Sequence, residues 1–586
     1  MKILAFAPHS FLWPHAFPEA HVLHSLREQG AEILYVECGE ALNSWCIPME
    51  STGADESLDE FKKKEICKQC IENAKKIEKI FDFSKTTLAT ILKNEDHIII
   101  DEIMGSLSPA NVMDFRFDGL DLGRYSLYNH FLQHKKIEFK VDEDSWPAVR
   151  LHLISCLRSF FAGKRLLAEF QPDLVCFYSS GYSVNLVVRL QAEAKGIPCY
   201  SIFAGSNWSN RLRTIHIAKK NSFTHFYERD ELWKKKFRSF TLTKESLGSV
   251  RSFLHFLLKG QSSFLYGGKP SRKTDKEIRE IFQIPKETKI ALLATSSYDE
   301  LKSAQLVDEL PLEQTAIFTN QIEWIKETVN FFKDKSDCFL IIRVHPRELP
   351  NQRDQVLSKH YLELRRIFDN LPTNVRVNLP KDNLSFYDLL EHIDFGLISW
   401  SSAGRDMAVW GIPFISYLDD YSFYPRRDLG VVAVDRKEYF SQIDQLLKVD
   451  GWSSERILKT FRWLGFEMYD TVFDISDVVD DRLILIESFS RRNFRRILRR
   501  LKLDQYLKPK PRSAKQGKLM YERVVNGKPT EEILEIDRSR LTSGLEMEEV
   551  KRILNSICEV QFGQNWQDNL SSKLRRNILG FIKHRG

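Results

Sequence analysis

The sequence of 586 residues has no apolar run of about 18 residues, the length at which a membrane-spanning helix is predicted. Its first residues, Met1–His9, lack the long apolar region and the small-residue cleavage site of a signal peptide. Low-complexity tracts and internal repeats are also absent. These absences predict a cytoplasmic globular protein. The chain is too long for one compact core, so at least two domains are expected.

Charge of one sign is in excess only locally. The chain carries a net charge of +6, but residues 491–512 hold ten Lys or Arg against one acid, so the remainder is net acidic. This distribution argues against a protein that coats nucleic acid. Beside the arginine pairs runs an apolar stripe at helical spacing, formed by Phe494, Ile497, Leu498 and Leu501. We expect the stripe to pack within the protein; the alternative is peripheral contact with the inner membrane through 489–512.

Cysteine is scarce, yet four of the nine cysteines lie close together in the sequence: Cys38, Cys46, Cys67 and Cys70. Disulfides are disfavoured in a cytoplasmic chain, and a C-x2-C pair with two further thiols nearby is a metal-site candidate. The group could hold structural zinc or an iron–sulfur cluster. The alternative is four reduced cysteines, because the seven-residue gap between the first two is looser than in a zinc ribbon.

A dinucleotide-binding fingerprint is missing from the first strand–helix connection. Lys2–Ala7 reads as a buried strand and Phe17–Gln29 as an amphipathic helix, but the link between them is long and aromatic and has no Gly-x-Gly-x-x-Gly. Such a link suits the wall of a cleft. His9, His15 and Glu19 lie where strand ends present chemistry, which makes them candidates for proton transfer. Each of the three, taken alone, is more readily explained as structural.

The pattern of elements divides the chain into four parts. A first Rossmann-like domain is expected on the acceptor side, then a connection, a second Rossmann-like domain that binds the donor, and a helical basic extension, over residues 1–228, 229–275, 276–450 and 451–586. The first domain contains a cysteine-bearing insertion at 38–146, in which Ile98–Asp101 is the clearest expected strand.

The second half alternates strands and helices with regular spacing. Continuous Val, Ile and Leu runs predict strands at Lys289–Ala294, Cys338–Val344, Val375–Asn378, Phe395–Ile398 and Phe414–Tyr417. Amphipathic helices separate them. The fold class expected is therefore α/β, with two doubly wound parallel sheets and a cleft between them.

Polar groups follow three of these strands. Thr295, Ser296 and Ser297 come after the first, Arg343, His345 and Arg347 end the second, and Ser399, Ser401, Ser402, Gly404 and Asp406 follow the fourth. The carboxyl ends of parallel strands meet at one edge, where ligands bind. Hydroxyls, backbone amides and arginines would suit phosphate, and a carboxylate would suit ribose. In the structural alternative, the serines cap a helix, His345 is a strand-end histidine, and Asp406 pairs with Arg405.

The motifs around these residues carry a family resemblance. Phe318-x-x-Gln-x-Glu-Trp-Ile, Leu340-Ile-Ile-Arg-Val-His-Pro-Arg-Glu and Ser401-Ser-Ala-Gly-Arg-Asp-Met-Ala-Val-Trp-Gly-Ile-Pro-Phe-Ile resemble bacterial glycosyltransferases of capsule and surface polysaccharide biosynthesis. The pattern is also similar to that of the Kdo and sialic-acid transferases and the teichoic-acid glycerophosphotransferases. The resemblance covers roughly residues 290–435 and implies the GT-B fold, a pair of Rossmann-like domains.

The resemblance implies a glycosyltransferase that moves a sugar from a CMP- or UDP-linked donor to a surface glycan or its lipid-linked precursor, without metal. His345 would contact the donor phosphate, Ser401 and Ser402 would hold phosphates, and Asp406 stands where many relatives have Glu. The catalytic base would come from the first domain. The alternatives are a CDP-polyol glycerophosphotransferase of the teichoic type, a sugar-nucleotide epimerase, or a non-catalytic nucleotide-sugar-binding assembly protein.

Overall fold

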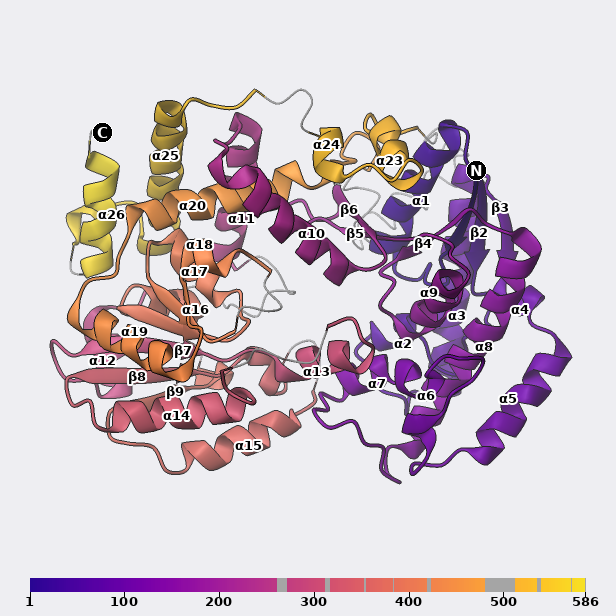
Figure 1. Ribbon diagram of the computed structural model, residues 1–586, viewed down its shortest axis with the longest axis horizontal. Coiled ribbons are helices and arrows are strands. Elements are labelled where there is room, and N and C mark those ends of the chain that lie inside the picture. The colour runs from indigo at the N-terminus through magenta and orange to yellow at the C-terminus, as the bar shows by residue number, and fades with distance from the viewer. Residues whose placement is uncertain are drawn as a thin grey trace, which may run out of the picture.

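The computed structural model describes residues 1–260, 271–310, 317–351, 355–382, 384–418, 423–479, 512–534, 539–570 and 572–584. Two α/β lobes lie side by side, the first on the right of Figure 1 and the second on the left. The segment 489–512, with its apolar stripe, lies outside the described residues except for Arg512. Among the described residues, no helix has the length and apolar character needed to cross a bilayer.

The first lobe is built on a seven-stranded sheet of order β13-β6-β5-β4-β1-β2-β3. Its strands are β1 (Lys2–Phe6), β2 (Glu32–Glu37), β3 (Ser84–Thr87), β4 (Leu174–Tyr178), β5 (Cys199–Ala204), β6 (Thr214–Lys219) and β13 (Phe473–Asp474). The five strands from β3 to β5 are parallel, and β6 and β13 add antiparallel pairs at one end. The insertion thus contributes β3 to the sheet.

The second lobe contains a six-stranded parallel sheet of order β12-β11-β10-β7-β8-β9. Its strands are β7 (Lys289–Ala294), β8 (Cys338–Arg343), β9 (Val375–Asn378), β10 (Phe395–Ile398), β11 (Phe414–Ser416) and β12 (Val431–Val432). The strands β10, β7 and β8 are direct neighbours. Their carboxyl ends therefore lie next to one another, as the doubly wound pattern predicts.

Helices connect the strands and cover the sheets. In the first lobe they are α1 (Trp13–Glu28), α2 (Ile47–Glu50), α3 (Glu60–Phe81), α4 (Leu88–Ile91), α5 (Asn94–Ser106), α6 (Leu122–Ser126), α7 (Tyr128–Gln133), α8 (Trp146–Phe170), α9 (Ser183–Ala194) and α10 (Ser222–Lys235). The residues expected as a strand at 98–101 belong instead to α5, so that prediction is wrong.

The remaining helices serve the second lobe and the returning chain. They are α11 (Lys244–Leu258), α12 (Asp275–Phe282), α13 (Tyr298–Leu306), α14 (Gln321–Lys333), α15 (Lys359–Phe368), α16 (Phe386–Leu390), α17 (Ala403–Val409), α18 (Arg426–Leu429), α19 (Arg436–Lys448), α20 (Ser454–Gly465), α23 (Gly517–Val524), α24 (Thr530–Leu534), α25 (Ser543–Phe562) and α26 (Lys573–Lys583).

Each sheet is packed on both faces, which confirms the doubly wound α/β class. Successive residues of β7 point to opposite sides: Ala291 and Leu293 join a core with Trp324 and Tyr439, whereas Ile290 and Leu292 join another with α17 and α25. In the first sheet the two faces are covered by α8 and α9 on one side and by α1 and α23 on the other.

The carboxyl-terminal part of the chain contacts the first lobe. Phe473 in β13 pairs with Ile215 in β6, and α23 packs on α1. The Ala514 N–H donates to Ser25 Oγ at 3.0 Å. Farther along, α25 packs against α11, next to the second lobe (Figure 1).

The two lobes also touch near the carboxyl edge of the second sheet. There α7 of the first lobe packs against α13 of the second (Figure 1). Lys135 donates to the Val356 carbonyl at 2.6 Å, and a buried ion pair joins Arg189 to Glu309 at 2.5 Å. These contacts hold the polar strand ends of the second lobe beside the first lobe.

Candidate functional site

The candidate site begins where β7 and β8 end. The Thr295 N–H donates to the Arg343 carbonyl at 3.0 Å, and the His345 N–H donates to Thr295 Oγ1 at 2.8 Å. Because β10 is the other neighbour of β7, the turn that starts at Ser399 lies beside them. The structure thus places the three predicted strand ends along one edge, as the parallel order requires.

His345 is oriented by the turn that follows it. It caps the short turn that begins with Pro346, and its Nδ1 accepts from the Arg347 N–H at 3.3 Å. Burial lowers the pKa of His345, so the ring is neutral at pH 7. With Nδ1 accepting, the proton of the neutral ring resides on Nε2. An N–H in this position can serve a phosphate oxygen.

The serines after β7 are largely buried. Gln321 holds the Ser296 backbone on both sides, accepting from its N–H at 2.8 Å and donating to its carbonyl at 3.1 Å. Ser297 Oγ donates to Glu300. Ser296 Oγ, in contrast, is buried and has no hydrogen-bond partner among the described residues. Of these hydroxyls, that of Ser296 is the one with no hydrogen bond to another described residue.

Both predicted phosphate-binding arginines already have protein partners. Arg343 Nη1 donates to Asn378 and to the Leu384 carbonyl, and burial lowers its pKa to about 10. Arg347 Nε donates to Asp299 at 2.7 Å, and its Nη2 donates to the Leu132 carbonyl of α7 at 2.6 Å. Arg347 therefore joins the second lobe to the first. Phosphate binding by either arginine stays a prediction.

The turn between β10 and α17 combines hydroxyls with close packing. Ser399 Oγ donates to Tyr417 at 3.2 Å, and Ser401 Oγ accepts from the Ala403 N–H at 3.2 Å, which is a cap of the kind the structural alternative describes. Ser402 is exposed. A Cβ on Gly404 would lie 2.5 Å from both Ile398 Cδ1 and the Tyr424 hydroxyl, so packing alone explains this glycine.

Asp406 is engaged in a local network. Its Oδ1 lies 3.1 Å from Arg405 Nη2, and its Oδ2 accepts from the Tyr387 hydroxyl at 3.3 Å. Arg405 also contacts Glu467, which pairs with the buried Arg229 at 3.2 Å. Burial raises the pKa of Asp406. The pairing with Arg405 matches the structural alternative, and the ribose contact stays a prediction.

The first-lobe candidates surround a small buried cavity at the carboxyl ends of β1 and β4. Its lining includes His9, His15, Glu19, Tyr178 and Tyr182. Asn185 Nδ2 donates to two backbone carbonyls, so its Oδ1 accepts from His9 Nε2 at 3.2 Å. Burial lowers the pKa of His9 to about 4 and of His15 to about 3, and it raises the pKa of Glu19 to about 8. All three groups are therefore neutral at pH 7.

Glu50, at the end of α2, is a functional candidate that no sequence motif indicates. Its side chain is partly exposed, and it accepts a hydrogen bond from Asn129 Nδ2 at 3.2 Å. Burial and the neighbouring Glu56 raise its pKa to about 8, and the positive charge of Arg347 opposes this shift. Glu50 is thus a first-lobe carboxyl group within electrostatic reach of the second lobe's strand-end arginine.

The four predicted metal-binding cysteines line one cavity of about 220 Å³ in the first lobe. Cys67 and Cys70 lie on α3, and Cys38 follows β2. Burial raises the pKa of every one of the four thiols, to about 12 for Cys38 and about 11 for Cys70. Proximity is therefore observed, and metal binding by these cysteines stays a prediction.

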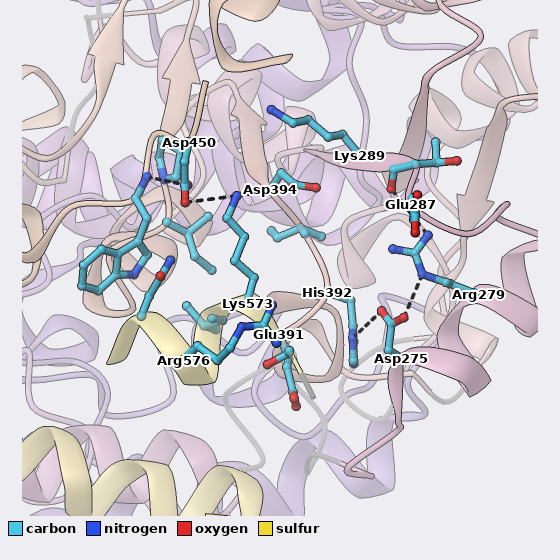
Figure 2. Close-up of a pocket in the computed structure, with 18 of the residues that line it drawn as sticks. Asp275, Arg279, Glu287, Lys289, Glu391, His392, Asp394, Asp450, Lys573 and Arg576 are labelled. Atoms are coloured by element: carbon cyan, nitrogen blue, oxygen red, sulfur yellow. Dashed lines mark hydrogen bonds and ion pairs between the residues drawn. The ribbon is translucent and has the colours of Figure 1, made fainter. Parts of the chain in front are cut away.

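A larger cavity, of about 480 Å³, opens at the opposite edge of the second sheet (Figure 2). It lies at the amino ends of β7 and β10. Its charged groups mostly pair with one another: Lys573 lies 3.1 Å from Asp450, and Asp275 lies 2.8 Å from Arg279 and 3.3 Å from His392. None of the residues predicted to bind phosphate or ribose lines it.

Comparisons with known proteins give distant structural likenesses. No family model and no curated protein matches the sequence. A UDP-GlcNAc 2-epimerase from Neisseria meningitidis is 12% identical and has a TM-score of 0.26, over 79% of this chain and 96% of that one. The β-Kdo 2,4 transferase KpsC from Thermosulfurimonas dismutans is 14% identical with a TM-score of 0.32, over 54% of this chain and 88% of that one. The glycosyltransferase SnogD from Streptomyces nogalater is 14% identical with a TM-score of 0.22, over 80% of this chain and 95% of that one. Scores this low carry no argument about this chain, so its own residues have to supply the function.

Proposed function

We propose that the protein is a glycosyltransferase that moves a sugar from a nucleotide-sugar donor, CMP- or UDP-linked, to a surface polysaccharide or its lipid-linked precursor. The observation that carries the proposal is the shared strand edge, where Thr295 and His345 are hydrogen-bonded and the Ser399 turn lies alongside. This edge faces the first lobe through the packing of α7 on α13. An acceptor bound by the first lobe would therefore lie close to the donor.

On the donor side, the protein would stabilise the charge that develops on the leaving phosphate. The neutral His345 ring can donate from Nε2, and the hydroxyls of Ser296 and Ser402 can donate to phosphate oxygens. Fixed donors of this kind act without the cost of reorienting solvent at the moment of reaction. We propose that transfer needs no metal in the donor site.

On the acceptor side, the reaction needs a base to take the proton of the attacking hydroxyl. Glu19 is buried, with 2% of its surface exposed, whereas Glu50 is partly exposed and sits within electrostatic reach of Arg347. We assign Glu50 as the first candidate for the base, ahead of His9, His15 and Glu19. Its carboxyl can accept a proton only in the ionised form, whose share grows as the pH rises toward its pKa of about 8. The bond formed joins the acceptor oxygen to the sugar carbon, and the bond broken releases the nucleotide.

Donor turnover by a His345→Ala variant tests the proposal. The purified protein is offered CMP- and UDP-linked sugars, and release of the nucleotide is followed with and without acceptor glycan. We expect His345→Ala to lose at least 100-fold in turnover while His97→Ala, at an exposed position of α5, keeps wild-type activity. Unchanged turnover in His345→Ala would refute the role of this edge.

The same assay distinguishes the alternative reactions. CDP-glycerol consumed with phosphodiester formation would identify a teichoic-type transferase, and isomerised UDP-sugar without release of nucleotide would identify an epimerase. Thermal stabilisation by a nucleotide with no turnover would identify a binding protein.

A further inference from the structure

Three histidines surround one buried glutamate in the first lobe. Glu56 Oε1 lies 3.0 Å from His130 Nδ1 and 2.8 Å from His152 Nε2, and Glu56 Oε2 lies 2.8 Å from His134 Nε2. The potential ligand atoms of Glu56, His130 and His134 all lie within 4.8 Å of one another. In the described part of the chain, this is the one place where three or more such atoms of His, Cys, Asp or Glu converge so closely.

The elements that supply these side chains converge from separate parts of the first lobe. His130 lies on α7 and His134 directly follows it, one helical turn on, so the two rings share a face with centroids 4.5 Å apart. His152 comes from the first turns of α8, and Glu56 from the loop between α2 and α3. Glu56, His130 and His152 are at most 5% exposed, whereas His134 is 30% exposed and leaves a path for an ion.

Glu56 brings a negative charge into this buried cluster. Glu56 is a buried carboxylate, and no Lys or Arg among the described residues forms an ion pair with it. A buried carboxylate is costly in a protein interior unless it is paired or hydrogen-bonded, and the partners of Glu56 are imidazole nitrogens. A divalent cation would compensate that charge and use the imidazole lone pairs.

We propose that Glu56, His130, His134 and His152 bind a divalent transition-metal ion of the zinc class. Three imidazole nitrogens and one carboxylate form a set that suits tetrahedral zinc, at about 2.0 to 2.2 Å from each ligand atom. Glu56, His130 and His134 form the converging core of this set, and His152, which contacts Glu56 Oε1, is its proposed fourth member. A zinc site with four protein ligands is structural. This site is separate from the cysteine-lined cavity, which offers sulfur ligands.

The ion would also fix the contact between the lobes. The α7 helix that carries His130 presents the Leu132 carbonyl to Arg347 of the second lobe and packs against α13. Linking α7 to α8 and to the Glu56 loop holds this surface rigid. Metal loss is therefore expected to weaken the hydrogen bond from Arg347 to the Leu132 carbonyl. The metal-site proposal itself does not depend on the activity proposed above.

Metal content of the full chain, expressed without a histidine tag, tests the proposal. After dialysis against Zn²⁺ and removal of loosely bound ion, elemental analysis is expected to give one equivalent per chain for the wild type. His134→Ala and Glu56→Gln are expected to weaken Zn²⁺ binding at least tenfold, while Cys67→Ser with Cys70→Ser and the exposed His97→Ala leave it unchanged. The His134→Ala change is favoured because this ring is the most exposed of the three, so the variant should fold.

Cobalt replacement provides a reading on the unmutated protein. Co²⁺ is expected to give a tetrahedral visible spectrum without the sulfur-to-metal charge-transfer band in the near ultraviolet. The assignment would be overturned if the sulfur band appeared. It would also be overturned if His134→Ala retained as much zinc as the wild type, or if the wild type retained no metal.

Discussion

At the residue scale, Glu19 shows how the first lobe holds an acid away from water. It is 2% exposed on α1, and its Oε1 has no hydrogen-bond partner among the described residues. Burial raises its pKa to about 8, and a backbone hydrogen bond from Tyr178 opposes the shift. The folded protein therefore keeps a proton on Glu19 that the unfolded chain releases near the ordinary glutamate pKa of 4.5.

Stability should therefore fall as pH rises past this carboxyl's unfolded-state pKa. Between about pH 4.5 and 8 the unfolded chain binds fewer protons at Glu19 than the folded one, which costs about 1.4 kcal/mol per pH unit. Glu19→Gln mimics the neutral form and escapes this cost. We expect the difference in unfolding free energy between variant and wild type to grow in favour of Glu19→Gln from pH 5.5 to 8, measured by urea unfolding. Parallel pH profiles would contradict the assignment.

Residue types in the sequence predicted where polar groups gather, but not what each one does. The parallel order alone brings Thr295 next to His345, so that pair was predictable. The partner of Arg347 was not, because a sequence cannot show that Asp299 pairs with it. The pairing of Asp406 with Arg405, in contrast, was the structural alternative for that residue. Glu56 and its histidines were missed because these four residues come from three distant segments, although the His130-x3-His134 spacing was a signal.

At the element scale, α17 depends on a close approach at its amino end. A Cβ on Gly404 would lie 2.5 Å from Ile398 Cδ1 and the Tyr424 hydroxyl, and 3.1 Å from the Phe414 ring. The helix ends at Val409 with Trp410 as its cap, and Gly411 follows with φ of +75°, a left-handed position that favours glycine. The turn before α17 is thus held by packing from β10, β11 and the chain after β11.

Replacing Gly404 by alanine should therefore destabilise the second lobe. Crowding against Ile398 and Tyr424 is expected to cost about 1 to 3 kcal/mol in the free energy of unfolding. Gly248 on α11 is the matched control, because a Cβ there meets nothing within 4 Å. Gly248→Ala should instead stabilise the helix by about 0.5 to 1 kcal/mol. Equal effects of the two substitutions, followed by chemical denaturation, would rule out this account.

Some helices and strands can be predicted from the sequence with correct bounds, and others cannot. Lys289–Ala294, Val375–Asn378 and Phe395–Ile398 have the predicted bounds, because each is a strongly apolar segment. The run at 98–101 was misleading because β-branched residues favour strands. In the structure Ile100 and Met104 are buried one helical turn apart, and the Lys93 N–H donates to Asp96 at the helix start, so tertiary packing outweighs propensity.

At the scale of the whole molecule, a buried ion pair joins the two lobes. Arg189 on α9 and Glu309 after α13 are 5% and 1% exposed, with 2.5 Å between Nη2 and Oε1. A second pair between the lobes, Arg124 with Asp308, is much more exposed, at 28% and 58%. The two pairs span the same interface at different depths, so they allow a direct comparison.

Removing one partner of the buried pair should cost far more than removing the exposed one. Arg189→Met leaves the Glu309 carboxylate buried without compensation and is expected to destabilise the protein by about 3 to 5 kcal/mol. Arg124→Met should cost less than about 1 kcal/mol. The double variant Arg189→Met with Glu309→Leu should recover most of the loss. Urea unfolding measures all three, and similar costs at both pairs would contradict the difference in burial.

Nucleotide binding at the carboxyl edge of the second sheet is the central claim, and calorimetric titration of CMP, UDP and CDP tests it most directly. We predict that at least one of them binds the wild type at one site per chain. His345→Ala should weaken that binding at least tenfold while the variant stays folded, as circular dichroism shows, whereas His97→Ala should bind as the wild type does. No binding of any nucleotide by the wild type, or equal affinity in His345→Ala, would contradict the account.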